Sequence, residues 1–236
     1  MTAPQNPRES LTEISGGWID ASRPLRPRTP VWPGDRPFEL HQERERGFVL
    51  SSFSTTCHVG THIDAPLHLD ESLHGVEDLR LERCVGEAEV VRVPVAAGGV
   101  KPRDVPSDWE PSAPRVLLRS DSHPIDTDFE EGFAGLSAEL VHWFADHGVE
   151  LVGIDTPSVD EFSSNNLPAH HALLERGMTW IEGLWLGDAE PGSYLMIALP
   201  ILLEGAEAAP VRAILKRLEV HQRDTKNSRL RPKRTE

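Results

Sequence analysis

The sequence predicts an α/β fold, a single domain in which helices pack on a mixed β-sheet core. Two observations carry this prediction. The chain has 236 residues, enough for one large domain with an ample core. Residues 136–147 carry apolar side chains at helical spacing, Gly148 ends that helix, and the apolar run 149–154 follows at once. A helix followed directly by a buried strand is typical of an α/β layer.

Further strands are predicted from short apolar or β-branched runs bounded by glycine or proline. In chain order, the expected elements are an ordered start at 17–20, a turn at 33–35, and strands at 48–54, 87–93, 115–119, 194–199 and 211–215. The predicted domain spans 16–219. We expect a flexible N-terminus over 1–15 and a disordered basic tail over 220–236, since neither shows apolar periodicity.

Composition argues against several classes of partner. The formal net charge is −14, and residues 221–236 hold six Lys or Arg against two Asp or Glu, so the rest is more acidic still. Such a body should repel nucleic acid and anionic lipid. Neither a long apolar run nor a signal-peptide core occurs, and the two cysteines, Cys57 and Cys84, fit a reducing compartment. We therefore expect a cytoplasmic protein that does not enter membranes.

The most informative segment covers residues 57–68, where three histidines and one aspartate occur within eleven positions. These are His58, His62, Asp64 and His68. Imidazole and carboxylate together are the ligands of Zn²⁺ and its first-row neighbours. In an extended segment the four side chains would project from one face, so they could converge on an ion. A polar surface strand is the alternative, which this spacing disfavours. Cys57 should point the opposite way and is interpreted as a small buried residue.

A second polar cluster follows the strand predicted at 149–154. Residues 155–158 open a polar loop, and two adjacent histidines, His170 and His171, lie beyond it. Adjacent side chains cannot both face one ion, so one is a candidate ligand and the other packs or supports it. Glu182 lies in an apolar run, where a free carboxylate is costly unless it is paired or metal-bound. A structural ion pair is the alternative, but the nearby histidine motif favours a metal ligand.

At these residues the chain resembles a known family. The segment from His58 to His68 is similar to the signature of the metal-dependent cyclase/hydrolase family, and more closely to its bacterial kynurenine formamidase (arylformamidase) branch. Seven further segments are similar to that branch in order and spacing: 32–35, 117–119, 153–158, 170–172, 181–184, 197–200 and 210–213. The likeness covers about 18–218, nearly the whole predicted domain.

The resemblance implies a swivelling β/β/α-like fold, a homodimer and a binuclear zinc site, with Mn²⁺ possible in place of Zn²⁺. It implies hydrolysis of N-formyl-L-kynurenine to L-kynurenine and formate in tryptophan breakdown. Carried over to this chain, His58 and His62 would ligate the first metal and His170 the second. Asp64 and Glu182 would bridge both ions.

The resemblance also implies roles outside the ligand set. His68 would be the catalytic acid/base, and Trp32 would lie against the aromatic amide substrate. Two features depart from the branch: Leu69 replaces a usual aromatic residue, and the loop 159–166 lacks the usual proline and lysine. Both are expected to touch the substrate pocket, so the resemblance predicts the class of reaction more firmly than the identity of the substrate.

Two other functions stay open. A hydrolase of the same family that opens a cyclic amide or lactone, as an isatin hydrolase does, would keep every ligand and change only the pocket. A non-catalytic metal-binding protein would need a missing acid/base, and the presence of His68 counts against it. A serine hydrolase is excluded, because no Gly-x-Ser-x-Gly motif occurs.

Overall fold

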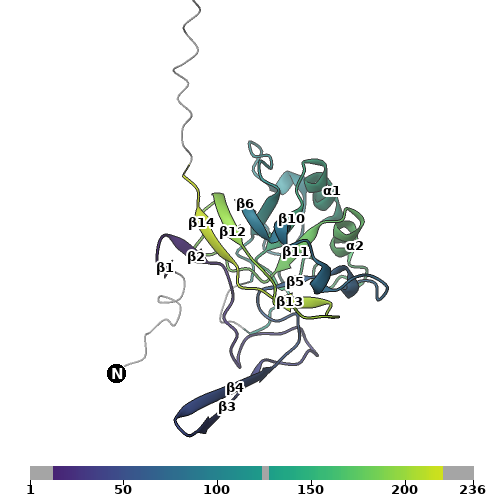
Figure 1. Ribbon diagram of the computed structural model, residues 1–236. Coiled ribbons are helices and arrows are strands. Elements are labelled where there is room, and N and C mark those ends of the chain that lie inside the picture. Colours follow the sequence, from purple (N-terminus) through teal and green to yellow (C-terminus); the bar gives the residue numbers. More distant parts are fainter. Residues whose placement is uncertain (1–12, 124–127, 220–236) are drawn as a thin grey trace, which may run out of the picture.

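The computed structural model describes residues 13–123 and 128–219 (Figure 1). Most of the predicted flexible N-terminus and all of the predicted basic tail lie outside these residues. The last part of the N-terminal segment, β1 (Glu13–Ile14), pairs antiparallel with β2 (Trp18–Asp20). No helix within the described ranges has the length and hydropathy of a membrane span.

A ten-stranded mixed sheet forms the centre of the molecule, which confirms the predicted α/β fold. Its strand order is β1-β2-β14-β12-β6-β8-β10-β11-β5-β13. The strands after β2 are β5 (His62–Asp64), β6 (Val85–Arg92), β8 (Arg115–Arg119), β10 (Leu151–Ile154), β11 (Thr179–Glu182), β12 (Gly192–Ile197), β13 (Ala208–Pro210) and β14 (Ile214–Arg217). The four central strands, β6, β8, β10 and β11, are parallel, and antiparallel strands flank them.

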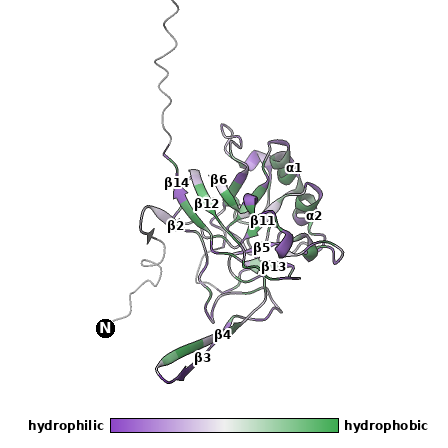
Figure 2. Ribbon diagram, in the orientation of Figure 1, coloured by the Kyte–Doolittle hydropathy of each residue, from purple (hydrophilic) through white to green (hydrophobic). Residues whose placement is uncertain are grey.

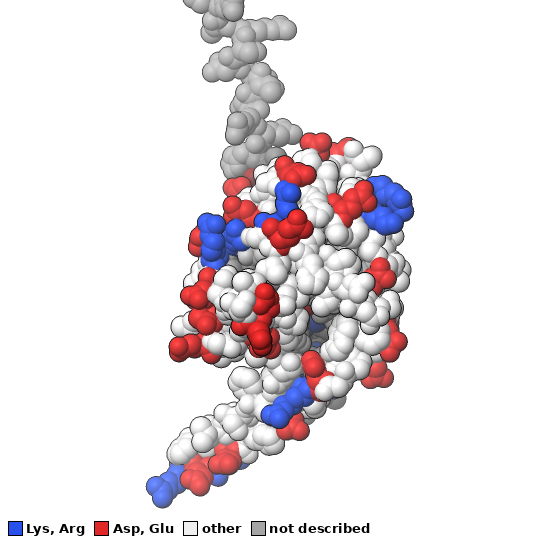
Figure 3. Space-filling view, turned by 90° about the vertical axis from the view of Figure 1, so that its right-hand side faces the viewer, with Lys and Arg blue, Asp and Glu red and all other residues white. Residues whose placement is uncertain are grey.

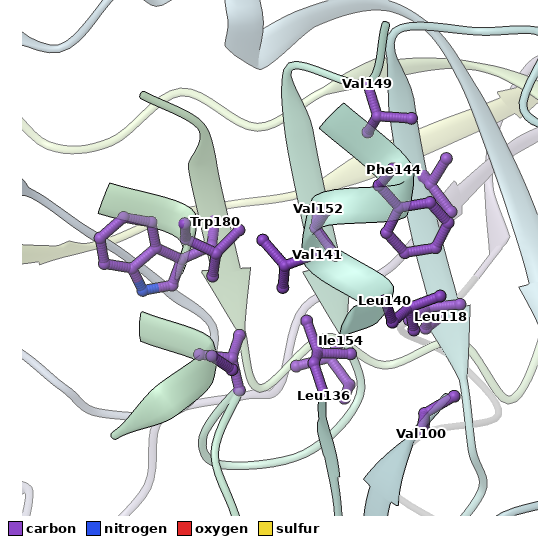
Figure 4. Close-up of a cluster of buried hydrophobic side chains, with 14 of the residues drawn as sticks. Val100, Leu118, Leu136, Leu140, Val141, Phe144, Val149, Val152, Ile154 and Trp180 are labelled. Atoms are coloured by element: carbon purple, nitrogen blue, oxygen red, sulfur yellow. The ribbon is translucent and has the colours of Figure 1, made fainter. Parts of the chain in front are cut away.

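Two helices, α1 (Ala138–Asp146) and α2 (Pro168–Glu175), cover one face of this sheet (Figure 1). Leu140, Val141 and Phe144 of α1 are fully buried against the side chains of Val152 and other strand residues (Figure 4). Burying such side chains stabilises the fold by roughly 1.5–3 kcal/mol each. The helix predicted at 136–147 is therefore confirmed, with a later start.

The start of α1 is set by a cap and by a neighbouring strand. Ser137 is the N-cap, and its hydroxyl accepts a hydrogen bond from Leu140 N. Leu136 belongs instead to β9 (Ala134–Leu136), which pairs with β7 (Gly98–Val100) in a separate two-stranded sheet. Four short 3₁₀ turns complete the described elements: η1 (Pro66–His68), η2 (Val76–Asp78), η3 (Leu81–Cys84) and η4 (Pro102–Asp104).

A hairpin extends away from the body of the molecule (Figure 1). It consists of β3 (Glu39–Glu45) and β4 (Phe48–Ser54), joined by Arg46 and Gly47, both with positive φ as the two-residue hairpin turn requires. The strand predicted at 48–54 is confirmed at the same residues. Its charge-rich partner β3 was not predicted. Figure 2 shows that β4 is largely hydrophobic although the arm projects from the body.

The two C-terminal strands differ in extent from their predictions. The strand predicted at 194–199 is β12, two residues earlier. The strand predicted at 211–215 begins only at Ile214, because Val211 forms an isolated bridge with Pro200 and the chain then turns into β14. These shifts leave the faces of the sheet unchanged.

Candidate metal centre

The polar side chains of the histidine motif converge at the short strand β5. Only His62 and Asp64 lie on a strand, two residues apart and on one face. The prediction of an extended segment from His58 to His68 is wrong outside β5. His58 lies in the loop before it, and His68 lies in η1 after Pro66. The convergence therefore depends on turns on both sides of β5.

Close backbone approach explains two glycines beside this centre. Gly60 has φ +61°, and an added Cβ would lie 2.7 Å from a Leu25 side-chain carbon. Gly183, directly after Glu182, has φ +64°, and an added Cβ would lie 1.9 Å from the Gly60 carbonyl oxygen. A larger side chain at Gly183 would collide with the backbone just before β5 and force β5 and β11 apart, whereas one at Gly60 would collide with the Leu25 side chain. The two glycines thus allow His62 to lie opposite Glu182 in the antiparallel register.

One candidate ligand group surrounds Asp64 on the side of the motif. Asp64 Oδ1 lies 3.1 Å from His58 Nδ1, and the rings of His58 and His68 have centroids 4.4 Å apart. One donor atom from each of His58, Asp64 and His68 lies within 4.8 Å of the others. His58 Nε2 also lies 3.4 Å from the half-exposed Glu207 carboxylate.

A second candidate group connects β5 with β11 and α2. His62 Nε2 lies 3.1 Å from Glu182 Oε2 and 3.6 Å from Asp64 Oδ1. His170 Nε2 lies 3.3 Å from Glu182 Oε1 and 3.6 Å from Asp64 Oδ2. His171 is exposed, so His170 is the histidine of this pair that faces the centre. Asp64 belongs to both groups, and His62, which shares a group with Glu182, has its ring centroid 5.1 Å from that of His58.

Hydrogen bonds behind these side chains orient them. His62 Nδ1 donates to the Gly60 carbonyl (3.2 Å), and His170 Nδ1 donates to Asp160 Oδ2 (2.7 Å). In both rings the Nε2 lone pair is then left facing the centre, the arrangement usual for metal-binding imidazoles. Trp180 Nε1 donates to Asp64 Oδ2 (3.0 Å).

Unsatisfied polar atoms indicate what the centre is built to hold. Within the described residues, His62 Nε2 and Asp64 Oδ1 are buried without a hydrogen-bond partner. A buried unsatisfied polar atom costs roughly 1–3 kcal/mol. The two atoms lie 3.6 Å apart and both are acceptors when the ring is neutral, so a cation between them would satisfy both. The donor set of imidazole and carboxylate therefore fits a metal ion.

The electrostatics also favour a cation. Burial lowers the pKa of the His58 imidazole, but the close contact with Asp64 and the charges of Asp64 and Glu182 outweigh it and raise this pKa to about 9. Burial would raise the pKa of Asp64, but its contacts with His170 and His58 hold it well below the usual value. Both carboxylates thus create a strongly negative potential at the centre.

Asp160 was not predicted as a site residue, yet it positions His170. Its carboxylate accepts hydrogen bonds from the backbone of Ala169 (2.9 Å) and His170 (3.0 Å), at the start of α2, as well as from the His170 ring. Leu167, before Pro168, has φ +42°, so α2 begins abruptly. Neither the short helix nor its remote cap leaves a pattern in the sequence.

We expect Asp160→Asn to weaken metal binding about 10- to 100-fold, because the His170 ring loses its charged partner. Competition with a chromogenic chelator measures this affinity. Asp146→Asn, at an exposed carboxylate on α1, is the control and should bind metal as the wild type does. An unchanged affinity in folded Asp160→Asn would show that Asp160 only caps α2.

The centre opens into a cavity of about 330 Å³. Six of the residues that line it were predicted from the sequence: Trp32, His58, His62, His68, His170 and Glu182. Phe129 and His123 also line it and carry no signal in the sequence. Further aromatic rings pack behind Trp32: its ring centroid lies 4.9 Å from Phe162, 5.5 Å from Phe129 and 6.3 Å from Phe133. The cavity thus joins a polar centre to an aromatic wall.

The two departures from the family pattern have different surroundings. Phe162, in the loop 159–166, packs on Trp32 and so reaches the aromatic wall. Leu69 packs against the helix-side core, and the expectation that it touches the substrate pocket finds no support among the residues lining the cavity.

The chemistry of this buried centre, imidazole and carboxylate, is typical of metal-dependent proteins. The chain belongs to the cyclase family: the sequence model described as "Putative cyclase" matches residues 19–161. The kynurenine formamidase of Salinibacter ruber is 42% identical over 204 residues, covering 84% of this chain and 96% of that protein. That of Bacillus cereus is 35% identical, with 84% and 97% covered. The resemblance found in the sequence is confirmed.

Solved structures give the same relationship. A predicted metal-dependent hydrolase from Bacillus stearothermophilus is 27% identical, has a TM-score of 0.72, and covers 84% of this chain and 97% of its own. Isatin hydrolase A from Labrenzia aggregata, bound to benzyl benzoate, is 19% identical with a TM-score of 0.69, covering 86% of this chain and 94% of its own. At that identity the second likeness concerns the fold alone.

Proposed function

We propose that this chain hydrolyses N-formyl-L-kynurenine to L-kynurenine and formate, a step of tryptophan degradation. The observation that carries the proposal is the cavity, in which a candidate metal centre and the Trp32 wall face one space. A formyl group is small and the arylamine leaving group is flat and aromatic, so the two ends of the cavity match the two ends of this substrate. Two relatives named kynurenine formamidase, which this chain matches over nearly their whole length, support the same reaction.

We assign two Zn²⁺ ions per chain to the centre, with Mn²⁺ as the alternative metal. His58, His62 and His170 would supply nitrogen ligands, and Asp64 and Glu182 would contact both ions. Divalent ions held there would supply a water of lowered pKa and would polarise the formyl oxygen. The two orphaned acceptors on His62 and Asp64 support this assignment.

His68 is proposed to transfer the proton. Its ring lies beside His58 and 5.7 Å from the His170 ring, at the cavity surface, while the ring nitrogens of His62 and His170 are engaged from behind. When the C–N bond of the formamide breaks, the arylamine nitrogen must gain a proton, and a histidine at this edge can donate it. Trp32 would hold the ring of the same leaving group and so fix its nitrogen near His68.

Two assays on one metal-loaded preparation test the proposed substrate. Kynurenine release from N-formylkynurenine should be fast, whereas opening of isatin should be slow or absent. Efficient isatin opening without kynurenine release would assign the chain to cyclic amides, the leading alternative. Metal binding with neither activity would support a non-catalytic metal-binding protein instead.

We also propose that the protein acts on a small molecule in the cytoplasm. On the face that Figure 3 shows, acidic and basic side chains of the described residues are interspersed. This supports a small-molecule substrate rather than nucleic acid or an anionic membrane. Cys57 and Cys84 are both free, which agrees with the reducing cytoplasm that we propose.

A homodimer is also proposed, and the projecting hairpin supports it. An isolated two-stranded sheet is marginally stable in water. Here Phe48 (58%), Leu50 (62%) and Phe53 (60%) are strongly exposed on β4. The body also exposes apolar side chains at Leu199 and Ile201, along a groove next to β13. We assign a second copy of the chain as the partner that covers the β3–β4 hairpin.

Replacing Phe48 and Leu50 together by serine should convert the dimer to a monomer of 26.2 kDa in light scattering. Each apolar side chain would lose roughly 1.5–3 kcal/mol of burial at the contact. His41→Ser lies on the same face of the hairpin and is the control, which should stay dimeric. A wild-type chain that scatters as a monomer at working concentration would contradict the proposal.

A further inference from the structure

One buried histidine in the cavity is not part of the candidate metal centre. His123 follows β8, is 6% exposed, and lines the same cavity as Trp32. Its Nδ1 is buried and has no hydrogen-bond partner within the described residues. Neither candidate ligand group includes it. His123 is therefore a buried polar side chain at the cavity wall, and its Nδ1 forms no hydrogen bond to another described residue.

The surroundings of His123 are aromatic. Its ring centroid lies 6.1 Å from that of Phe129 and 6.1 Å from that of Phe133, and Phe129 in turn packs on Trp32. Burial, and the nearby charge of Arg23, lower the pKa of His123 to about 4. At neutral pH the ring is thus uncharged and carries one N–H donor and one acceptor nitrogen.

The Arg23 side chain holds the backbone of His123 in place. The Arg23 guanidinium donates to the His123 carbonyl oxygen and to the Asp155 carbonyl oxygen, both at 2.7 Å. It also donates to the Gly183 carbonyl at 3.1 Å, next to the metal centre. Arg23 therefore links the His123 loop to the strand end that carries Glu182.

A packing role alone explains His123 poorly. Buried polar side chains are normally hydrogen-bonded, and leaving one unpaired costs roughly 1–3 kcal/mol. His62 and His170 in the same molecule have partners for their Nδ1 atoms, whereas Nδ1 of His123 has none among described residues. A phenylalanine would fill this aromatic position without that cost, so packing does not account for an imidazole at the wall of the cavity.

We propose that His123 is a substrate-binding residue that donates a hydrogen bond to the carbonyl oxygen carried by the aromatic leaving group. The inference rests on the proposed function and names which aryl formamides the site prefers: those with an acyl group on the ring. In this arrangement the formyl group lies at the metal centre and the aryl ring lies on Trp32. The acyl substituent of the ring then lies at the aromatic end of the cavity. His123 is the neutral donor at that end.

The test compares two substrates: N-formylkynurenine, which carries the acyl group, and formanilide, which lacks it. His123→Phe keeps the aromatic packing and removes the donor. We expect KM for N-formylkynurenine to rise about 10- to 100-fold, the usual loss for one hydrogen bond to a buried group, with kcat and zinc content close to wild type. Formanilide hydrolysis should change less than about twofold. His123→Gln, which retains an N–H donor, should recover most of the lost affinity.

The possible results distinguish a wrong role for His123 from a wrong function for the chain. Equal losses on both substrates, or no loss on either, would overturn the role of His123 while leaving the hydrolase intact. Failure of the wild type to release kynurenine would overturn the proposed function and this inference with it. If His123→Phe does not fold, the same two-substrate comparison with His123→Leu decides the question.

Discussion

His62→Ala is expected to lose bound metal and activity together, whereas His68→Ala should keep its metal and lose kcat. His62 Nε2 is fully buried, its other nitrogen is committed to Gly60, and it faces both carboxylates, so nothing can replace it as a ligand. His68 lies at the cavity edge after Pro66. Losing a proton donor typically costs about 10²–10⁴ in rate, while losing a metal ligand removes the activated water.

Elemental analysis and kcat on the same preparations distinguish the two roles. The comparison is needed because His68 also lies within ligand distance of His58 and Asp64. An equal loss of metal in both variants would make His68 a ligand and would leave the proton donor unassigned.

Glu182→Gln is expected to lower the occupancy of both metal positions and to reduce activity by about 10² or more, because an anion that contacts both ions is lost. Glu182 Oε1 accepts from Val159 N (2.7 Å), a bond that glutamine can keep. The other oxygen faces His62 Nε2, where glutamine would then present its amide N–H, which cannot bind a cation.

Glu207→Gln is the matched control for this substitution. Glu207 lies 3.4 Å from His58 Nε2, but its side chain is 41% exposed, so its charge is screened by water. It should keep both metals and nearly full activity. Normal occupancy and rate in Glu182→Gln would show that Glu182 is a structural ion-pair partner instead.

The sequence alone predicted those parts of the fold that depend on local patterns. The helix at α1 and the strands at β4, β8 and β10 follow from apolar periodicity and glycine boundaries. The metal motif was recognisable because His62 and Asp64 alternate on one short strand. Their convergence with His58 and His68 also required turns that alternation does not describe.

Other parts of the site depend on contacts between distant residues, which leave no local pattern. The Trp180 side chain reaches Asp64 across 116 positions, and Asp160 holds His170 from ten positions away. The aromatic wall brings Trp32 against Phe129 and Phe162 from separate loops. The hairpin strand β3 reads as charged surface, because no part of it is buried within one chain.

We propose that kynurenine formation depends on two metal ions held by these residues. Zinc titrated into chelator-stripped enzyme, with kynurenine release measured at each addition, tests it most directly. Activity should rise until about two equivalents per chain are bound and then stay constant. Full activity at one equivalent, or kynurenine release by the stripped enzyme, would contradict it.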